Sequence, residues 1–339
     1  MAKGFMTPDE LRTRLTDFLQ RARGGRPVRI EGLRLLTGGA SRQTWSFDAV
    51  VEDAGGTQTL PLVLRSDPRV SEGLMSRELE YRLLEAAHDA SVPVPKVHLM
   101  GDDALGVPFF LMERVEGETI ARRLLRDDEY AGARAAMTTQ LGEILAKIHR
   151  IPLDGLDELP APPTERSPAE TEVERFEQVY RAITPEPHPA FELALRWLRQ
   201  RAPASERRTF VHGDYRIGNV IFGPEGTRSI LDWELAHVGD PMEDLGWICV
   251  RSWRFGGDQP VGGIGAREEL WRAYESAGGG SVDADHALWW EAFGNLRWGI
   301  ICIGQAKTYL DGRSKSVELA SIGRRVAETE WELLQIMGA

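Results

Sequence analysis

Cysteine is scarce in this chain of 339 residues: Cys249 and Cys302 are the only two, and both lie in apolar segments. Such a pair does not indicate a disulfide framework or a cysteine-based metal site, so we expect two reduced core residues. Long apolar runs are also missing, since none approaches the roughly 18 residues of a membrane span. Nothing after Met1 resembles a signal peptide. We therefore expect a cytoplasmic protein that does not bind membranes.

Basic residues are in the minority, with 41 Lys and Arg against 52 Asp and Glu and a formal net charge of −11. A nucleic-acid-binding protein usually presents a basic face, so we expect no nucleic-acid partner. An anionic small ligand stays compatible with this balance, because local charge matters more than the sum. Hydrophobic residues make up 42% and charged residues 27%, as in an ordinary globular protein.

The order of apolar patterns predicts an α+β chain with two lobes. A capping hydroxyl followed by proline, Thr7-Pro8, begins a helix. Short strand-like runs and one further helix follow, and the sequence after about Thr119 is mainly helical. We expect a first lobe over residues 1–116, an antiparallel sheet plus helix that binds nucleotide, and a mostly helical lobe over 117–339 that carries catalysis and substrate. The expected elements of the first lobe are strands at 33–36, 44–51, 60–64, 96–100 and 109–114 and a helix at 76–90.

One segment carries most of the chemical information. An H-x-D-x-x-x-x-N pattern runs from His212 through Asp214 to Asn219. Two apolar runs follow it, separated by Gly-Pro-Glu-Gly at 223–226, which is typical of a hairpin turn. Asp232 comes directly after the second run. Because a hairpin brings its two ends together, we expect Asp214, Asn219 and Asp232 to converge.

Two carboxylates and an amide form a set of hard oxygen ligands suited to Mg²⁺ and phosphate. The same order, a catalytic-loop Asp, an Asn and then a metal-binding Asp, occurs in kinases. We predict that Asp214 is the catalytic residue that accepts the proton of a substrate hydroxyl, and that Asn219 and Asp232 bind Mg²⁺. His212 is expected to hold the loop in place, and Asp244 to brace it or to begin a helix.

Candidates for ATP binding lie in the first lobe. Adjacent glycines and a serine between two strands allow close approach to phosphates. A cation at a strand end could contact phosphates and pair with a carboxylate of the next helix. The strand that joins the lobes could hold adenine between apolar side chains and backbone groups. The glycines and the serine are Gly38, Gly39 and Ser41, and the cation with its carboxylate is Arg65 with Glu78. The adenine candidates are Met112, Glu113 and Val115.

With these residues in place, the chain resembles the aminoglycoside phosphotransferase and choline-kinase-like family. The motifs that carry the resemblance are His212-Gly213-Asp214 with Asn219, Ile230-Leu231-Asp232-Trp233-Glu234, and Gly239-Asp240-Pro241 with Asp244-Leu245. The resemblance covers about residues 33–310 and is strongest to the branch that is fused to acyl-CoA dehydrogenases. It implies a protein-kinase-like fold, ATP and Mg²⁺ as cofactors, and phosphorylation of a small-molecule hydroxyl, with a hydroxyacyl-CoA as one acceptor.

Arg65 stands where aminoglycoside kinases carry Lys, which departs from the family pattern.

Several functions stay open at this point. An aminoglycoside or other antibiotic is an alternative acceptor, because residues 154–192 hold ten acids against three arginines. A solvated helix face explains that count equally well. Cations that could meet CoA phosphates are Arg251, Arg254, Arg297, Arg313 and Lys315. The departure at Arg65 leaves a nucleotide-binding pseudokinase open as an alternative. Another is a metallohydrolase, whose metal cluster would consist of His212, Asp214, Asp232 and His237.

Overall fold

The computed structural model describes residues 6–36, 43–53, 55–66, 75–101, 103–184, 186–205 and 207–338. The chain divides into two compact units, residues 1–116 and residues 117–339. The predicted candidates Gly38, Gly39 and Ser41 lie outside the described residues. No helix within the described ranges is long and apolar enough to cross a membrane. Cys249 and Cys302 are free and buried, as predicted.

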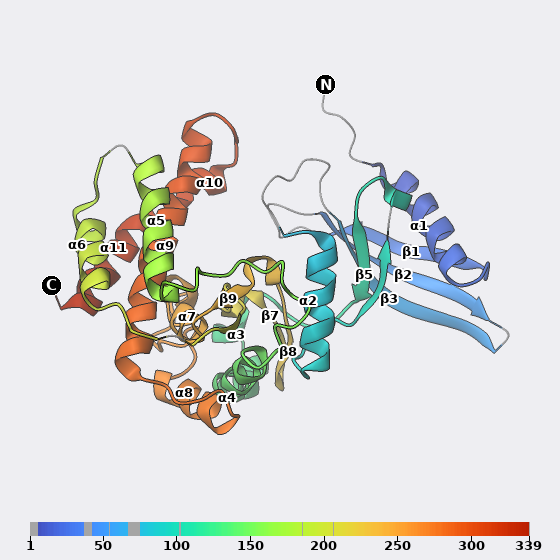
Figure 1. Ribbon diagram of the computed structural model, residues 1–339. Coiled ribbons are helices and arrows are strands. Elements are labelled where there is room, and N and C mark those ends of the chain that lie inside the picture. Colours follow the sequence, from blue (N-terminus) through green and yellow to red (C-terminus); the bar gives the residue numbers. More distant parts are fainter. Residues whose placement is uncertain are drawn as a thin grey trace. The chain divides into compact units, whose positions relative to one another are not determined.

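Unit 1 is built on a five-stranded antiparallel sheet with the strand order β1-β2-β3-β5-β4 (Figure 1). The two α-helices among the described residues of this unit pack against the sheet. The elements are α1 (Pro8–Ala22), β1 (Val28–Leu35), β2 (Gln43–Asp53), β3 (Gly56–Ser66), α2 (Arg77–Asp89), β4 (Val97–Gly101) and β5 (Phe109–Glu113). The predicted strands and helices are therefore confirmed in kind, and most of the strands are longer than their apolar runs.

The two helices cover opposite faces of the sheet. Leu11, Leu15 and Leu19 of α1 lie in one core with alternating strand residues such as Phe109. Its neighbour Phe110 points to the other face, because successive strand residues alternate, and its ring meets Tyr81 of α2 edge-on. The N-terminus of α1 carries the capping box expected of its sequence, in which the side chains of Thr7 and Glu10 bond each other's backbone N–H.

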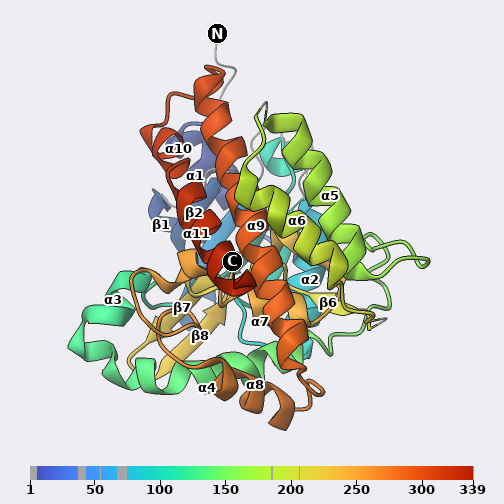
Figure 2. The same cartoon turned by 90° about the vertical axis from the view of Figure 1, so that its left-hand side faces the viewer.

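Unit 2 contains nine helices and two short antiparallel sheets within its described residues. The longest helix, α9, contacts α5 and α6 on one side and α10 and α11 on the other (Figure 2). The helices are α3 (Ala121–Arg126), α4 (Ala131–Ile148), α5 (Pro168–Ile183), α6 (Pro189–Gln200), α7 (Met242–Trp247), α8 (Arg267–Ser276), α9 (Ala284–Leu310), α10 (Val317–Ile322) and α11 (Arg325–Met337). The strands are β6 (Thr209–Val211), β7 (Val220–Gly223), β8 (Gly226–Ile230) and β9 (His237–Gly239).

The strands of unit 2 frame the motif segment. β7 and β8 form the predicted hairpin, with Gly223 opposite Gly226 across the turn. The pair β6 and β9 was not expected, because each strand has only three residues. Val211 of β6 lies opposite His237 of β9. The two small sheets therefore hold both the start and the end of the segment that carries Asp214, Asn219 and Asp232.

Candidate active site

Asp214 and Asn219 lie side by side in the loop between β6 and β7. The Nδ2 of Asn219 donates to the Oδ2 of Asp214 at 2.7 Å and to the backbone oxygen of Asp214 at 2.9 Å. These bonds use only the nitrogen of the amide. The Oδ1 of Asn219, the atom that would ligate a cation, is not part of them.

Asp232 reaches the same region through the hairpin. The backbone N–H of its neighbour Leu231 donates to the carbonyl of Asn219 at 2.8 Å, and the Nε2 of His212 lies 3.2 Å from the carbonyl of Leu231. Asp232 itself has φ 66° and ψ 65°, a left-handed conformation that is uncommon for a residue with a side chain. Such backbone strain is concentrated at functional sites, where the surroundings enforce it.

His212 acts as a structural residue, as predicted. Its side chain is fully buried, and its Nδ1 accepts the backbone N–H of Asp214 at 3.2 Å. Burial lowers the pKa of His212, against the opposing influence of nearby carboxylates. The ring is therefore neutral, with Nε2 donating to Leu231 and Nδ1 accepting from Asp214.

The carboxylate of Asp244, in α7, holds the backbone of the loop just before Asp214. Its Oδ2 accepts the backbone N–H of His212 at 2.8 Å, and its Oδ1 accepts that of Gly213 at 2.9 Å. The Nε2 of His149 lies 3.1 Å from Oδ2, and both side chains are completely buried. Burial opposes ionisation, but the hydrogen bond and charge of His149 and the backbone donors hold the pKa of Asp244 below its ordinary value. The predicted bracing role of Asp244 is confirmed.

A second anchor comes from α9, far along the chain. Arg297 donates to the carbonyl of Gly213 at 3.1 Å and to the Oε1 of Glu243 at 2.7 Å. His237 places Nε2 3.1 Å from the other oxygen of Glu243 and Nδ1 2.9 Å from the carbonyl of Leu235. Burial disfavours the charged imidazole, but the charge and hydrogen bond of Glu243 outweigh it and raise the pKa of His237 to about 9.

Two residues that the sequence did not single out contact the carboxylate of Asp214. The indole Nε1 of Trp247 donates to its Oδ1 at 2.8 Å, and the Nε of Arg216 donates to the same oxygen at 3.0 Å. Trp247 ends α7, and it is separated from Asp214 by the hairpin and β9. No spacing rule links Trp247 with Asp214, so only the fold brings these two side chains together, whereas Arg216 is a near neighbour of Asp214 in the loop.

In unit 1, Arg65 forms an ion pair with a different residue from the predicted Glu78. Its Nε lies 2.6 Å from the Oε1 of Glu80, and Arg77 binds the other oxygen of the same carboxylate. Glu80 is 3% exposed, whereas Glu78 is exposed to solvent. The physical reason is helical periodicity. Because residues three, four and seven positions apart share a helix face, residues 80, 83, 84 and 87 lie together on the buried face of α2, and position 78 turns away from it.

The remaining nucleotide candidates lie at the end of β5. Met112 is buried, Glu113 is exposed and Val115 is half-buried. The backbone N–H of Glu113 already donates to the carbonyl of Lys96 at 2.8 Å. A contact to adenine at Glu113 therefore has to use a group other than this N–H.

Asn219 and Asp232 supply the hard oxygens that Mg²⁺ prefers, so the side chains present fit this ion. Among the described residues, no group of three or more His, Cys, Asp or Glu is arranged to hold a metal ion. The two histidines of the metallohydrolase alternative, His212 and His237, are instead engaged with backbone carbonyls and, for His237, with Glu243. These contacts do not support that alternative.

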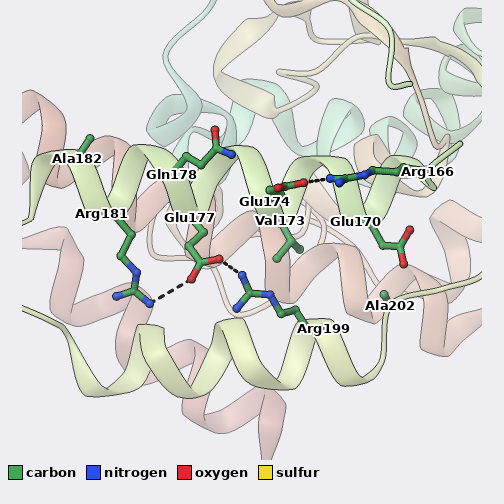
Figure 3. Close-up of a pocket in the computed structure, with 10 residues that line it drawn as sticks. All are labelled: Arg166, Glu170, Val173, Glu174, Glu177, Gln178, Arg181, Ala182, Arg199 and Ala202. Carbon is green, nitrogen blue, oxygen red and sulfur yellow. Dashed lines mark hydrogen bonds and ion pairs between the residues drawn. The ribbon is translucent and has the colours of Figure 1, made fainter. Parts of the chain in front are cut away.

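A groove of about 910 Å³ lies between α5 and α6 in unit 2 (Figure 3). It is lined by Arg166, Glu170, Val173, Glu174, Glu177, Gln178, Arg181, Ala182, Arg199 and Ala202. Glu174 pairs with Arg166, and Glu177 pairs with both Arg181 and Arg199. Two of its three carboxylates are therefore already neutralised by arginines of the same groove.

Comparison with known proteins gives a consistent result. The profile of the family described as "Phosphotransferase enzyme family" matches residues 32–284. Acyl-CoA dehydrogenase family member 10 of Mus musculus is 31% identical over 297 residues, which are 80% of this chain and 27% of that protein. The probable acyl-CoA dehydrogenase IBR3 of Arabidopsis thaliana is 28% identical over 59% of this chain and 26% of its own length. The chain thus spans about a quarter of the length of these relatives.

Solved structures share the fold. A putative aminoglycoside phosphotransferase from Ralstonia eutropha superposes with a TM-score of 0.72 and 26% identity, over 95% of this chain and 98% of its own. The aminoglycoside phosphotransferase APH(4)-Ia, in a ternary complex with AMP-PNP and hygromycin B, gives a TM-score of 0.60 at 18% identity, over 95% and 98% of the two chains. The predicted α+β, protein-kinase-like fold is confirmed.

Proposed function

Because the chain belongs to the phosphotransferase enzyme family, a family of kinase-type enzymes that phosphorylate hydroxyl groups, we propose that it uses Mg-ATP to phosphorylate a hydroxyl group of a small molecule. One arrangement carries this proposal. The side chain of Asn219 donates a hydrogen bond to the carboxylate of Asp214, and the backbone carbonyl of Asn219 accepts one from the residue before Asp232. Structural relatives were solved with AMP-PNP or ADP, which supports ATP as the donor.

In this proposal Asp214 orients the acceptor hydroxyl and takes its proton late, as the new bond to phosphorus forms. Asn219 and Asp232 would hold Mg²⁺, which supplies neutralisation of charge on the phosphate oxygens when it is bound. The neutral His212 and the carboxylate of Asp244 keep the loop in one conformation, so that the hydroxyl meets a fixed acceptor.

Unit 1 supplies the nucleotide contacts in this proposal. Arg65, held by Glu80, would meet the phosphates. The pseudokinase alternative rests on Arg65 alone. The ion pair with Glu80 holds this arginine in one position, which argues against that alternative. The other proposed contacts are Gly38, Gly39 and Ser41 for the phosphates and Met112, Glu113 and Val115 for adenine.

For the acceptor we propose a hydroxyacyl-CoA, supported by relatives that carry acyl-CoA dehydrogenase in their names. Two of the expected cations do not serve CoA phosphates. Arg254 is buried and paired with Glu291 and Glu332, and Arg297 is buried against Glu243. The exposed cations that remain for that role are Arg251, Arg313 and Lys315.

An aminoglycoside acceptor is the second candidate, favoured by the aminoglycoside phosphotransferases among the structural relatives. The acidic segment that motivated it gives little support. The carboxylates of Glu174, Glu177 and Glu192 are paired with arginines, so they do not form the open anionic surface that a polycation needs.

A coupled assay of ADP release tests the proposal. Mg-ATP is combined with 3- and 4-hydroxyacyl-CoAs, aminoglycosides, macrolides, choline-like amines and simple sugars, each in turn. We expect turnover with the hydroxyacyl-CoAs, lost in Asp214→Ala and kept in Asp157→Ala, which removes an exposed loop carboxylate. Turnover confined to aminoglycosides would establish the second candidate, and no turnover with any acceptor would contradict the proposal.

A further inference from the structure

The carboxylate of Asp214 receives three hydrogen bonds, and they are unevenly shared between its two oxygens. Oδ1 accepts from Trp247 Nε1 at 2.8 Å and from Arg216 Nε at 3.0 Å. Among the residues that the structure describes, Oδ2 accepts only from Asn219 Nδ2, at 2.7 Å. An ionised carboxylate has about two acceptor sites on each oxygen. The pair of donors therefore fills Oδ1 and leaves one site on Oδ2.

Each donor of this pair packs against aromatic residues that lie outside the loop. Trp247 is 3% exposed and lies in an apolar cluster with Val250 and Trp253. The guanidinium of Arg216 lies 4.6 Å from the centre of the Trp253 ring, a cation–π contact. The side chain of Arg216 therefore contacts both the ring of Trp253 and the carboxylate of Asp214.

We propose that Trp247 and Arg216 are positioning residues that fix the orientation of Asp214 and assign the chemical step to its Oδ2. This inference rests on the proposed kinase activity. The acceptor hydroxyl gives its proton to Oδ2 as its oxygen bonds to the γ-phosphorus. At the same time the bond from that phosphorus to the bridging oxygen breaks, and the electron pair leaves with ADP. Without the two donors on Oδ1 the carboxylate could rotate, and the free site would no longer face the hydroxyl.

Trp247→Phe is the sharpest test, because it removes the indole N–H and keeps an aromatic ring. The guanidinium of Arg297 lies 4.6 Å from the centre of the Trp247 ring, and Phe preserves a partner for that contact. The matched control is Trp289→Phe, which removes an indole N–H that donates to the carbonyl of Leu198 at 3.0 Å, another buried bond in the same unit. Arg216→Lys is the second variant, since it keeps the charge and loses the planar Nε donor.

We expect Trp247→Phe and Arg216→Lys to lower kcat by about 10- to 100-fold, as misplacing a catalytic group does, with the KM for ATP within about twofold of the wild type. Trp289→Phe should keep kcat within about twofold. The reasoning is overturned if Trp247→Phe and Trp289→Phe lower kcat equally, or if the loss appears in KM alone.

Nuclear magnetic resonance tests the same contact without any turnover. The indole N–H signal of Trp247 is identified among those of the ten tryptophans by its loss in Trp247→Phe. In Asp214→Ala this signal should move upfield, because its acceptor is gone, while the signal of Trp289 stays in place. An unmoved Trp247 signal would refute the contact. Absent turnover in the wild type would refute the proposed function instead, so the two failures are distinguishable.

Discussion

Removing the carboxylate of Asp244 should destabilise unit 2 more than removing an exposed carboxylate would. In Asp244→Ala the backbone N–H groups of His212 and Gly213 and the ring of His149 lose their acceptor inside the core. Each buried donor left unpaired costs about 1–3 kcal/mol, and Asp244→Ala leaves three of them. We expect a loss of about 4 kcal/mol in the free energy of unfolding.

For a unit of this size, that loss corresponds to a fall in Tm of about 8–16 °C. Thermal denaturation followed by circular dichroism measures it. The control is Asp283→Ala, which removes an exposed helix cap with a single bond to the backbone N–H of His286 at 2.8 Å and should cost about 1 kcal/mol. A loss no larger than that of the control would refute the bracing role of Asp244.

The effect should depend on pH in a definite direction. Because the pKa of Asp244 in the folded protein lies below its ordinary value of 3.8, the stabilisation is complete above that value and is lost as the pH falls through the folded pKa. The difference in Tm between the wild type and Asp244→Ala should therefore shrink as the pH falls below about 4. A constant difference at every pH would contradict the charge state assigned here.

Three further predictions concern single positions. The raised pKa of His237, about 9, stabilises the folded protein fully below the ordinary pKa of histidine, and this stabilisation is lost as the pH rises through about 9. In urea titrations the free energy of unfolding of the wild type should exceed that of His237→Gln by about 3 kcal/mol at pH 6 and equal it by pH 10. A difference that persists at pH 10 would contradict this prediction. Gly213→Ala, at φ 78° and with its Cβ 2.3 Å from a carbonyl oxygen, should cost at least about 3 kcal/mol, against about 1 kcal/mol for Gly155→Ala at the same φ with open space around it; equal losses of Tm would sink the steric argument. Glu80→Gln should abolish the gain in Tm that Mg-ATP gives the wild type, whereas Glu78→Gln should keep it; the reverse result would restore the pairing expected from the sequence.

The sequence was most informative where function depends on short-range pattern. The glycines at 223 and 226 and the apolar runs around them define the β7–β8 hairpin, and that hairpin connects Asn219 with the segment of Asp232. Local turn chemistry and alternation are enough to predict such an element. The same holds for the start of α1 at Thr7, whose cap is made by residues three positions apart.

The contacts around Asp214 depend on packing between distant segments. Trp247 comes from α7 and Arg297 from α9, and no periodicity connects either with the H-x-D-x-x-x-x-N pattern. The error at Glu78 has a different origin, because Glu78 and Glu80 belong to the same helix. The helical spacing of Glu80 with the buried Leu83, Leu84 and Ala87 puts Glu80, and not Glu78, on the face that packs against the core.

The most direct test of the kinase proposal is phosphorus NMR of the complete reaction with Mg-ATP and the best acceptor. The wild type should convert the γ-phosphoryl signal of ATP into a phosphate monoester in amounts equal to the ADP formed. Asp214→Ala should show this conversion at least about 100-fold more slowly, since it lacks the proton acceptor. Inorganic phosphate as the only product, or an unchanged rate in Asp214→Ala, would contradict the proposed transfer to a hydroxyl group and the role of Asp214 in it.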